Sequence, residues 1–236
     1  MTSQGVFITG TDTAVGKTLV AGALLTALSR TKLNVCGFKP VAAGAHDDGH
    51  GPRNPDAELL MECSSPGASY QQVNPVLVEA AIAPHIGLEQ EGRHFEMQAV
   101  VDAFEALTRR FDFVVVEGAG GWLVPLDDEQ DMASLAARLD LPVILVVGVR
   151  LGCINHSLLT VEAIRSRGLR LAGWIGSCLE PDMPALPENL KTLDRVLGAP
   201  RLGLLPWLEQ EGEVRKASEA SLAFDSQQLC NTLIRD

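Results

Sequence analysis

A glycine-rich stretch near the N-terminus has residue types that could bind phosphate. The stretch GTDTAVGKT runs from Gly10 to Thr18, after the apolar run VFIT and before an apolar, helix-forming segment. Between a strand and a helix, successive backbone N–H groups and the helix N-terminus form a phosphate-binding loop. Lys17 would then reach the terminal phosphates of a nucleotide, and the Thr18 hydroxyl would bind Mg²⁺. The alternative is a strand-to-helix turn with an incidental GKT.

The spacing of this loop departs from the common pattern. That pattern has four residues between its two glycines, whereas five separate Gly10 from Gly16. Thr11 therefore stands where the first glycine is expected, and a β-branched residue tolerates positive φ poorly. We expect a turn that differs from the common form or moves to Gly10.

An acidic residue, Glu117, directly follows the apolar run FVVV. A carboxylate at the end of a buried strand beside a phosphate loop is placed to hold a metal ion near the phosphates. The glycines behind it, Gly118, Gly120 and Gly121, allow the backbone to approach a ligand closely. Without the loop, a solvated acid at a strand end would explain Glu117 equally well.

Two further charged residues are candidates for the same site. Lys39 ends a predicted strand before Pro40 and could neutralise an anionic substrate, although a surface lysine would look the same. Asp56 opens a predicted helix, where N-capping is the simpler explanation and metal binding the alternative.

Aromatic, histidine and cysteine residues give weaker signals. Trp207 follows a predicted strand and either packs or flanks a nucleotide base, and His156 near a predicted helix start is assigned a structural role. The five cysteines show no Cys-x-x-Cys pair and no zinc-ligand spacing. They are expected to be reduced thiols in a cytoplasmic protein.

The elements that position these residues alternate along the chain. Apolar runs predict strands over 6–9, 35–39, 113–117, 143–149, 171–177 and 202–205, and helical patterns cover 17–30, 99–110, 132–139, 156–168 and 188–198. This alternation predicts an α/β fold with a doubly wound, mainly parallel sheet and helices on both faces. Ligands of such sheets bind beyond the carboxyl ends of the strands.

Composition narrows the class of protein further. The 236 residues fit a single domain over 1–236, in which the Gly- and Pro-rich segment 44–84 is an irregular part. The net charge of −11 argues against a nucleic-acid partner. No apolar run is long enough to span a membrane and no secretory signal is evident.

Several stretches in the same order resemble the dethiobiotin synthetase family. They are GTDTAVGKT with its five-residue spacing, GFKPVAAG, RNPDA, VNP followed by APHI, VVVEGAGGWLVPL, PVILVVGVRLGCINH, LAGWI and PWL, within residues 5–208. The resemblance implies a P-loop nucleoside-triphosphatase fold and an ATP- and Mg²⁺-dependent ligase. Such an enzyme joins CO₂ or bicarbonate to 7,8-diaminopelargonic acid through an N-carbamate and a carbamic–phosphoric anhydride.

The resemblance also implies site residues and a homodimer. Thr13 and Lys39 would contact the carbamate, with Lys17 also catalytic, and Thr18, Asp56 and Glu117 would hold Mg²⁺. Substrate would further contact Ala43 and, on the partner subunit, the segment containing Gly152, Cys153 and Asn155. The nucleotide would contact Ala14, Val15, Gly16, Lys17, Thr18, Leu19, Asp56, Glu117, Gly118, Ala119, Gly120, Ser177, Pro206, Trp207 and Leu208.

Two positions depart from the family pattern. Ala43 stands where the family often has a hydroxyl residue, so one contact to substrate is missing. Ser177 stands where the family commonly supplies Asn to adenine, so we expect a relaxed nucleotide preference.

Two other classes of protein share features of this sequence. Switch ATPases of the partition or septum-positioning type carry an additional lysine near the loop start, where this chain has Gly10-Thr11-Asp12. Amidotransferase synthetases need a glutaminase domain with a nucleophilic cysteine, for which this chain is too short.

Overall fold

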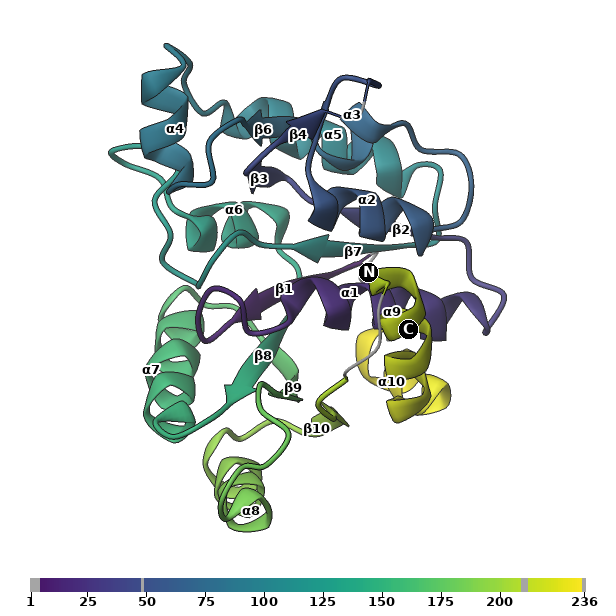
Figure 1. Cartoon of the computed structure of the whole chain (residues 1–236), viewed down its shortest axis with the longest axis vertical. Helices are drawn as coiled ribbons and strands as arrows, with labels where there is room; N and C mark the ends of the chain where they lie inside the picture. The colour runs from purple at the N-terminus through teal and green to yellow at the C-terminus, as the bar shows by residue number, and fades with distance from the viewer. Residues whose placement is uncertain (1–4, 48, 209–211, 235–236) are drawn as a thin grey trace.

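A six-stranded parallel sheet forms the centre of the molecule in a computed structural model that describes residues 5–47, 49–208 and 212–234 (Figure 1). The strand order is β10-β9-β8-β1-β7-β2, and every pairing is parallel. The α/β doubly wound prediction is therefore confirmed. The strands are β1 (Gly5–Gly10), β2 (Val35–Phe38), β7 (Phe113–Glu117), β8 (Val143–Val149), β9 (Leu171–Cys178) and β10 (Arg201–Leu205).

Helices cover both faces of this sheet. The chain steps from β1 outward to β2 and then back across the sheet. Because crossovers between parallel strands are right-handed, this order places α1 on one face and the later crossover helices on the other. These helices are α1 (Lys17–Ser29), α5 (Met97–Thr108), α6 (Met132–Leu139), α7 (Cys153–Ser166) and α8 (Leu186–Val196). The predicted helices are present, but α5, α7 and α8 each begin two or three residues earlier than predicted, and β2 ends at Phe38, one residue early.

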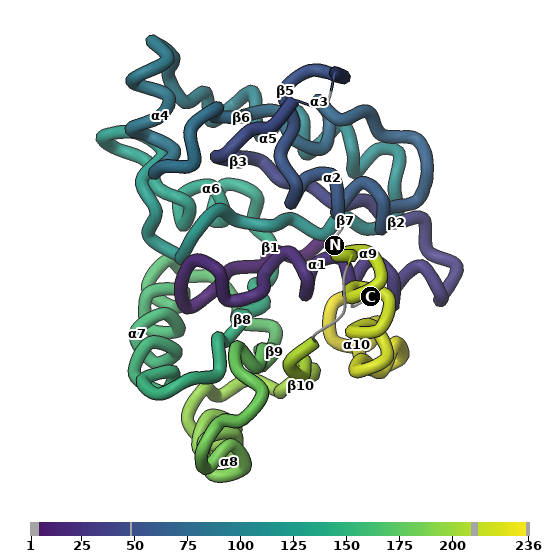
Figure 2. The backbone as a smooth tube through the Cα atoms, viewed as in Figure 1, coloured from purple at the N-terminus to yellow at the C-terminus, as the bar shows by residue number. Residues whose placement is uncertain are grey.

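The helix that follows the glycine-rich loop is buried on nearly all sides. Its apolar residues face the sheet, and helices α9 (Glu213–Ala220) and α10 (Ser226–Leu233), with the 3₁₀ turn η1 (Ser221–Ala223) between them, lie beside it (Figures 1 and 2). Gly22 of α1 allows this approach, since a Cβ there would lie 3.2 Å from the Cβ of Ala217. The C-terminal segment is thus packed against the helix that begins at Lys17.

The segment between β2 and α5 is more regular than the sequence predicts. It contains two small two-stranded sheets, β3 (Val41–Ala43) with β6 (Val76–Val78) and β4 (His46–Asp47) with β5 (Pro52–Arg53). It also contains helices α2 (Pro55–Glu62), α3 (Tyr70–Val73) and α4 (Pro84–Gln90). These strands are two or three residues long, too short for side-chain alternation to reveal them. Asp48, in the loop, lies outside the described residues.

Strand register brings the predicted site residues to one edge. Ile8 of β1 pairs with Glu117 at the end of β7, and Gly10 pairs with Val146 of β8. Because the strands are parallel, the segments that follow β1, β2, β7, β9 and β10 all leave the sheet at this edge. No helix in the described part of the chain is long and apolar enough to cross a membrane.

Candidate active site

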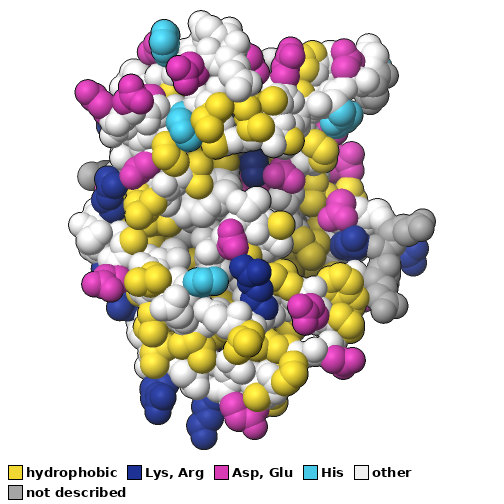
Figure 3. Space-filling view, turned by 60° about the vertical axis from the view of Figure 1, so that its left-hand side comes forward, with side chains coloured by type: hydrophobic (Ala, Val, Ile, Leu, Met, Phe, Trp, Pro, Cys, Tyr) yellow, Lys and Arg dark blue, Asp and Glu magenta, His cyan; other side chains and the backbone are white. Residues whose placement is uncertain are grey.

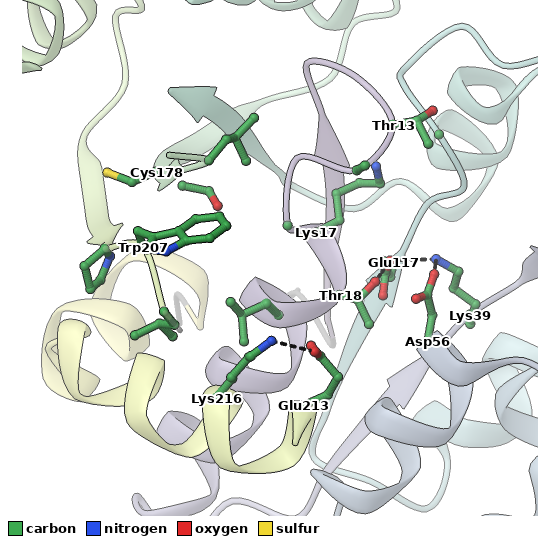
Figure 4. Close-up of a pocket in the computed structure, with 18 residues that line it drawn as sticks. Thr13, Lys17, Thr18, Lys39, Asp56, Glu117, Cys178, Trp207, Glu213 and Lys216 are labelled. Carbon is green, nitrogen blue, oxygen red and sulfur yellow. Dashed lines mark hydrogen bonds and ion pairs between the residues drawn. The ribbon is translucent and has the colours of Figure 1, made fainter. Parts of the chain in front are cut away.

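A cleft of about 530 Å³ lies at the carboxyl ends of the strands (Figure 4). Segments far apart in sequence form its walls: the glycine-rich loop, the ends of β2, β7 and β9, the segment after β10, and helices α2 and α9. Most of the predicted nucleotide and catalytic residues line it, namely Thr13, Ala14, Gly16, Lys17, Thr18, Leu19, Lys39, Asp56, Glu117, Gly120, Ser177, Pro206, Trp207 and Leu208.

The backbone of the loop accommodates the extra residue in a conformation that the sequence does not predict. Positive φ falls on Ala14 (55°) and Gly16 (86°), so the turn does not move to Gly10. Thr11 is tied to the neighbouring strand instead: its N–H donates to Val146 O at 3.0 Å, and Gly148 N–H donates to its hydroxyl at 3.3 Å. A side chain on Gly16 would meet the Ser177 hydroxyl at 2.7 Å, so the loop lies directly against the end of β9.

Lys17 lies at the floor of this loop. Its Nζ donates to the backbone oxygen of Asp12 at 3.0 Å, and its side chain is largely buried. Burial lowers the pKa of Lys17 from 10.5 to about 8, against the opposing effect of Glu117. Few contacts compensate the Lys17 ammonium for its loss of water, so an anionic ligand that contacts it would stabilise its charged form.

This pKa predicts a pH-dependent affinity for nucleotide. Above about pH 8 the free protein loses the Lys17 proton, and binding a phosphate then requires its return, so Mg²⁺-free ADP should bind roughly tenfold more weakly per pH unit. Calorimetric titration between pH 7 and pH 9.5 measures this. The Lys17→Met variant should bind more weakly throughout and lack the dependence. An affinity of the native protein that stays flat to pH 9.5 would contradict the assignment.

A cluster of charged side chains occupies the other end of the cleft. Lys39 Nζ donates to Glu117 Oε1 at 2.6 Å and to Asp56 Oδ2 at 2.9 Å, and the Thr18 hydroxyl donates to the same Glu117 oxygen at 2.8 Å. Glu117 is fully buried and Lys39 nearly so. Burial raises the pKa of Glu117 and opposes the charge on Lys39, but the two carboxylates outweigh that effect and raise the pKa of Lys39.

Asp56 is available to this cluster because another residue caps its helix. Asn54 is the N-cap of α2, and its side chain accepts from the N–H groups of Asp56 and Ala57. N-capping by Asp56 is therefore wrong. Its carboxylate instead faces Lys39, which helps to lower the pKa of Asp56 although burial acts in the opposite direction.

The opposite end of the cleft is formed by residues suited to a base and a sugar. Ser177 and Cys178 end β9, and Trp207, which is 45% exposed, lines the wall rather than packing into the core. Sequence reasoning missed four lining residues: Cys178, Leu179, Glu213 and Lys216. Glu213 and Lys216 form an ion pair of 2.9 Å on α9, and the one available signal was the amphipathic pattern of residues 213–220.

Some predicted contact residues lie outside this cleft. Val15 is buried in the core, and Gly118, Ala119 and Ala43 are not among the lining residues. The α7 start is separate as well: Gly152 and Asn155 are exposed, whereas Cys153 is buried. The Cys153 N–H donates to Arg150 O at 3.0 Å and is therefore not exposed for an anion. Arg150 forms a 2.7 Å ion pair with Asp12, so this region adjoins the loop.

Comparison with known proteins agrees with the family read from the sequence. A family model, AAA_26, described as an AAA domain, matches residues 4–215. The ATP-dependent dethiobiotin synthetase BioD of Cellvibrio japonicus is 51% identical over 88% of this chain and 91% of its own length. The enzyme of the same name from Ralstonia nicotianae is 45% identical over 92% of this chain and 95% of its own.

Solved structures with low sequence identity share the fold. The MinC:MinD cell division protein complex of Aquifex aeolicus has a TM-score of 0.60 at 14% identity, over 99% of this chain and 98% of that one. The septum site-determining protein MinD of Pyrococcus horikoshii, complexed with Mg-ADP, has a TM-score of 0.57 at 17% identity, over 96% and 95%. These likenesses confirm the P-loop fold alone. The sequence relatives decide the family, and the chain belongs to the ATP-dependent dethiobiotin synthetases.

Proposed function

We propose that this enzyme carboxylates 7,8-diaminopelargonic acid and closes it to the cyclic urea dethiobiotin, with cleavage of ATP to ADP and phosphate. One amine adds to CO₂ and forms a carbamate; a carbamate oxygen accepts the γ-phosphoryl group; the second amine then attacks the carbamoyl carbon and displaces phosphate. The observation that carries this proposal is the convergence of two lysines, Lys17 and Lys39, and an acidic pair in one cleft beside a phosphate-binding loop.

The two lysines address the main electrostatic obstacle of this reaction. A carbamate anion must approach the polyanionic triphosphate, and two like unit charges 4 Å apart repel by about 4 kcal/mol at an effective dielectric near 20. Lys17 and Lys39 line the same cleft. Their ammonium groups would offset this repulsion and stabilise the charge that develops on the transferred phosphoryl group. Thr13, which lies at the cleft beside Gly120, would contact the carbamate.

The ligands at the cleft suit Mg²⁺. Thr18, Asp56 and Glu117 supply a hydroxyl and two carboxylates, and Glu117 Oε2 is buried with no hydrogen-bond partner among the described residues. Such a partial oxygen set is typical of Mg²⁺, which keeps waters and binds substrate phosphates. No group of three His, Cys, Asp or Glu side chains in the described ranges could hold a metal by itself. When bound, Mg²⁺ would neutralise phosphate charge.

Ser177 predicts a weak preference among nucleotide bases. Its side chain is small, buried and pressed against Gly16, and it cannot pair with adenine through two hydrogen bonds as an amide can. We expect ATP to exceed CTP and GTP by less than about 100-fold in kcat/KM, a difference of about 2.7 kcal/mol. Steady-state rates with each nucleotide at saturating diamine measure this, and a larger preference for ATP would show the expectation to be wrong.

We infer a homodimer from the face that contains α4 and α7. Leu151, Leu158 and Leu159 on and before α7 are exposed, as are Ile82 and Ile86 near α4. Figure 3 shows this face, where hydrophobic side chains gather on both sides of a central hollow. Exposed apolar side chains in such numbers are typical of a protein interface. The partner subunit's α7 start would then meet the substrate carboxylate through its exposed residues, Gly152 and Asn155.

The Leu159→Glu variant tests this interface. A buried, unpaired charge at the interface should shift the protein to monomers and lower activity with it, because each site would lose the other subunit's contribution. Sedimentation velocity at matched protein concentrations distinguishes monomers from dimers. Leu222→Glu is the control, since Leu222 is exposed as well but lies on η1, away from α7. A Leu159→Glu protein that sediments as the native one does would exclude this face.

The state of the cysteines supports a cytoplasmic location for the protein. The five cysteines are free thiols in the structure, and Cys36 is buried with its pKa raised to about 11 by burial. Free thiols suit a cytoplasmic protein. We further propose that residues 1–236 act as one domain, with small molecules rather than nucleic acid or membrane as partners.

Isotopic labelling tests the proposed reaction. The protein is incubated with ATP, Mg²⁺, the diamine and ¹³C-bicarbonate, and the product is analysed by mass spectrometry and carbon NMR. We expect a cyclic urea in which only the new carbonyl carbon carries the label. A labelled carbamate that never closes, or no labelled product, would refute the proposal.

A further inference from the structure

One ammonium group contacts both carboxylates that are proposed as metal ligands. Lys39 Nζ lies 2.6 Å from Glu117 Oε1 and 2.9 Å from Asp56 Oδ2, and the Thr18 hydroxyl donates to that same Glu117 oxygen at 2.8 Å (Figure 4). Lys39 is 3% exposed and Glu117 is fully buried. The position between the two carboxylates is thus filled by a cation that belongs to the chain.

A divalent ion cannot use these oxygens while Lys39 stays. Mg²⁺ binds oxygen at about 2.0–2.1 Å, so an ion on Glu117 Oε1 and Asp56 Oδ2 would crowd the ammonium that contacts both atoms. Like charges at such a distance in a buried site repel strongly. The two cations therefore compete for one position.

Hydrogen bonds hold the backbone of Lys39 in place, but open space beside its side chain allows the side chain to change conformation. Lys39 N–H donates to Val73 O at 2.8 Å, and Asn74 Nδ2 donates to Lys39 O at 2.7 Å. The side chain itself lines the cleft of about 530 Å³, which lies open beside it. A change of side-chain rotamers is enough to move the ammonium from the acids into the cleft.

We propose that Lys39 is the resident counter-ion of the nucleotide-free site and that Mg²⁺ with nucleotide displaces it, releasing its ammonium toward the anionic substrate. The inference rests on the magnesium site and the reaction proposed above. It implies that the lysine becomes available to the carbamate only after the metal–nucleotide complex has bound. The acidic pair thereby has two uses: it compensates Lys39 at rest and binds the ion when the enzyme is loaded.

NMR of the native protein tests the displacement without an activity measurement. Lysine labelled with ¹³C and ¹⁵N in its side chain reports each ammonium, and the Lys39 signal is the one missing from Lys39→Met, or from Lys39→Arg if the first variant does not fold. We expect ADP with Mg²⁺ to shift this signal in step with occupancy, and ADP alone to leave it nearly in place. An unchanged signal with Mg²⁺ and ADP, as when the ion uses only Glu117 Oε2, would overturn the proposal. Displacement by ADP alone would overturn it equally.

Binding of Mn²⁺ to the nucleotide-free protein gives an independent readout by electron paramagnetic resonance. Lys39→Met should bind Mn²⁺ at least about tenfold more tightly than the native protein, because the competing charge is gone. Lys191→Met removes an exposed lysine on α8 and should leave the affinity unchanged. Equal affinities in the native protein and Lys39→Met would refute the competition. A native enzyme that forms dethiobiotin while its Lys39 signal never moves would refute this inference alone and leave the proposed function standing.

Discussion

The Lys39→Met enzyme is expected to form dethiobiotin about 100- to 1,000-fold more slowly at saturating substrates than the native enzyme. Removal of one preorganised charge that stabilises a developing anion costs about 2.7–4 kcal/mol of transition-state stabilisation. Methionine keeps the length and apolar stem of the side chain and removes only its charge. Initial rates of dethiobiotin formation at saturating ATP and diamine measure the effect on kcat.

The same substitution has a second consequence for the folded protein. Glu117 and Asp56 lose their shared counter-ion, and a buried carboxylate such as that of Glu117, left unpaired, destabilises a fold by about 3–5 kcal/mol unless it binds a proton or a metal. The rates must therefore be measured on protein that circular dichroism shows to be folded. Lys191→Met, with the same change at an exposed position, should retain native rates and stability. Undiminished ring closure by folded Lys39→Met would remove Lys39 from the mechanism.

The Glu117→Gln enzyme is expected to lose at least about 100-fold in kcat/KM for ATP, because an amide is a poorer Mg²⁺ ligand than a carboxylate and because Lys39 loses its closest counter-ion. Partial recovery should follow when Mg²⁺ is raised, since the variant binds the ion more weakly. Initial rates over a matrix of ATP and Mg²⁺ concentrations separate the two effects.

The neighbouring cluster offers a control for this substitution. Glu58 lies on the same helix as Asp56 but pairs with His46 and Arg53 away from the cleft. Glu58→Gln should therefore keep native kinetics and native Mg²⁺ dependence. If Glu117→Gln also keeps them, Glu117 is a buried partner of Lys39 and not a metal ligand.

Much of the fold follows from the sequence because buried parallel strands are nearly continuous apolar runs. FVVVE and VILVVGV predict β7 and β8 with their observed bounds. The first turns of α7 and α8 were missed because CIN and LP give no strong helix signal. The C-terminal helices were missed because their short amphipathic patterns lie in a segment that no resemblance covers, and their position depends on packing, chiefly against α1.

The candidate site was predictable where it depends on strand ends. Lys39 directly follows β2, which pairs with β7, and Glu117 is the last residue of β7, which pairs with β1, so the parallel sheet brings both residues to the same edge. The partnership of Asp56 with Lys39 was not predictable, since it requires that Asn54 cap the helix and leave the Asp56 carboxylate unused. The part of the cleft wall formed by Glu213 and Lys216 was not predictable, because it depends on how α9 packs and no local sequence pattern specifies that packing.

Nucleotide turnover with and without the diamine tests the central claim most directly. ADP release is followed with ATP, Mg²⁺, bicarbonate and 7,8-diaminopelargonic acid, and then with bicarbonate or the diamine omitted in turn. An enzyme whose phosphoryl acceptor is the carboxylated diamine should release one ADP for each dethiobiotin formed and almost none when either reactant is missing. Turnover that continues at the same rate without the diamine would mean that water accepts the phosphoryl group, as in a switch ATPase, and would contradict the account.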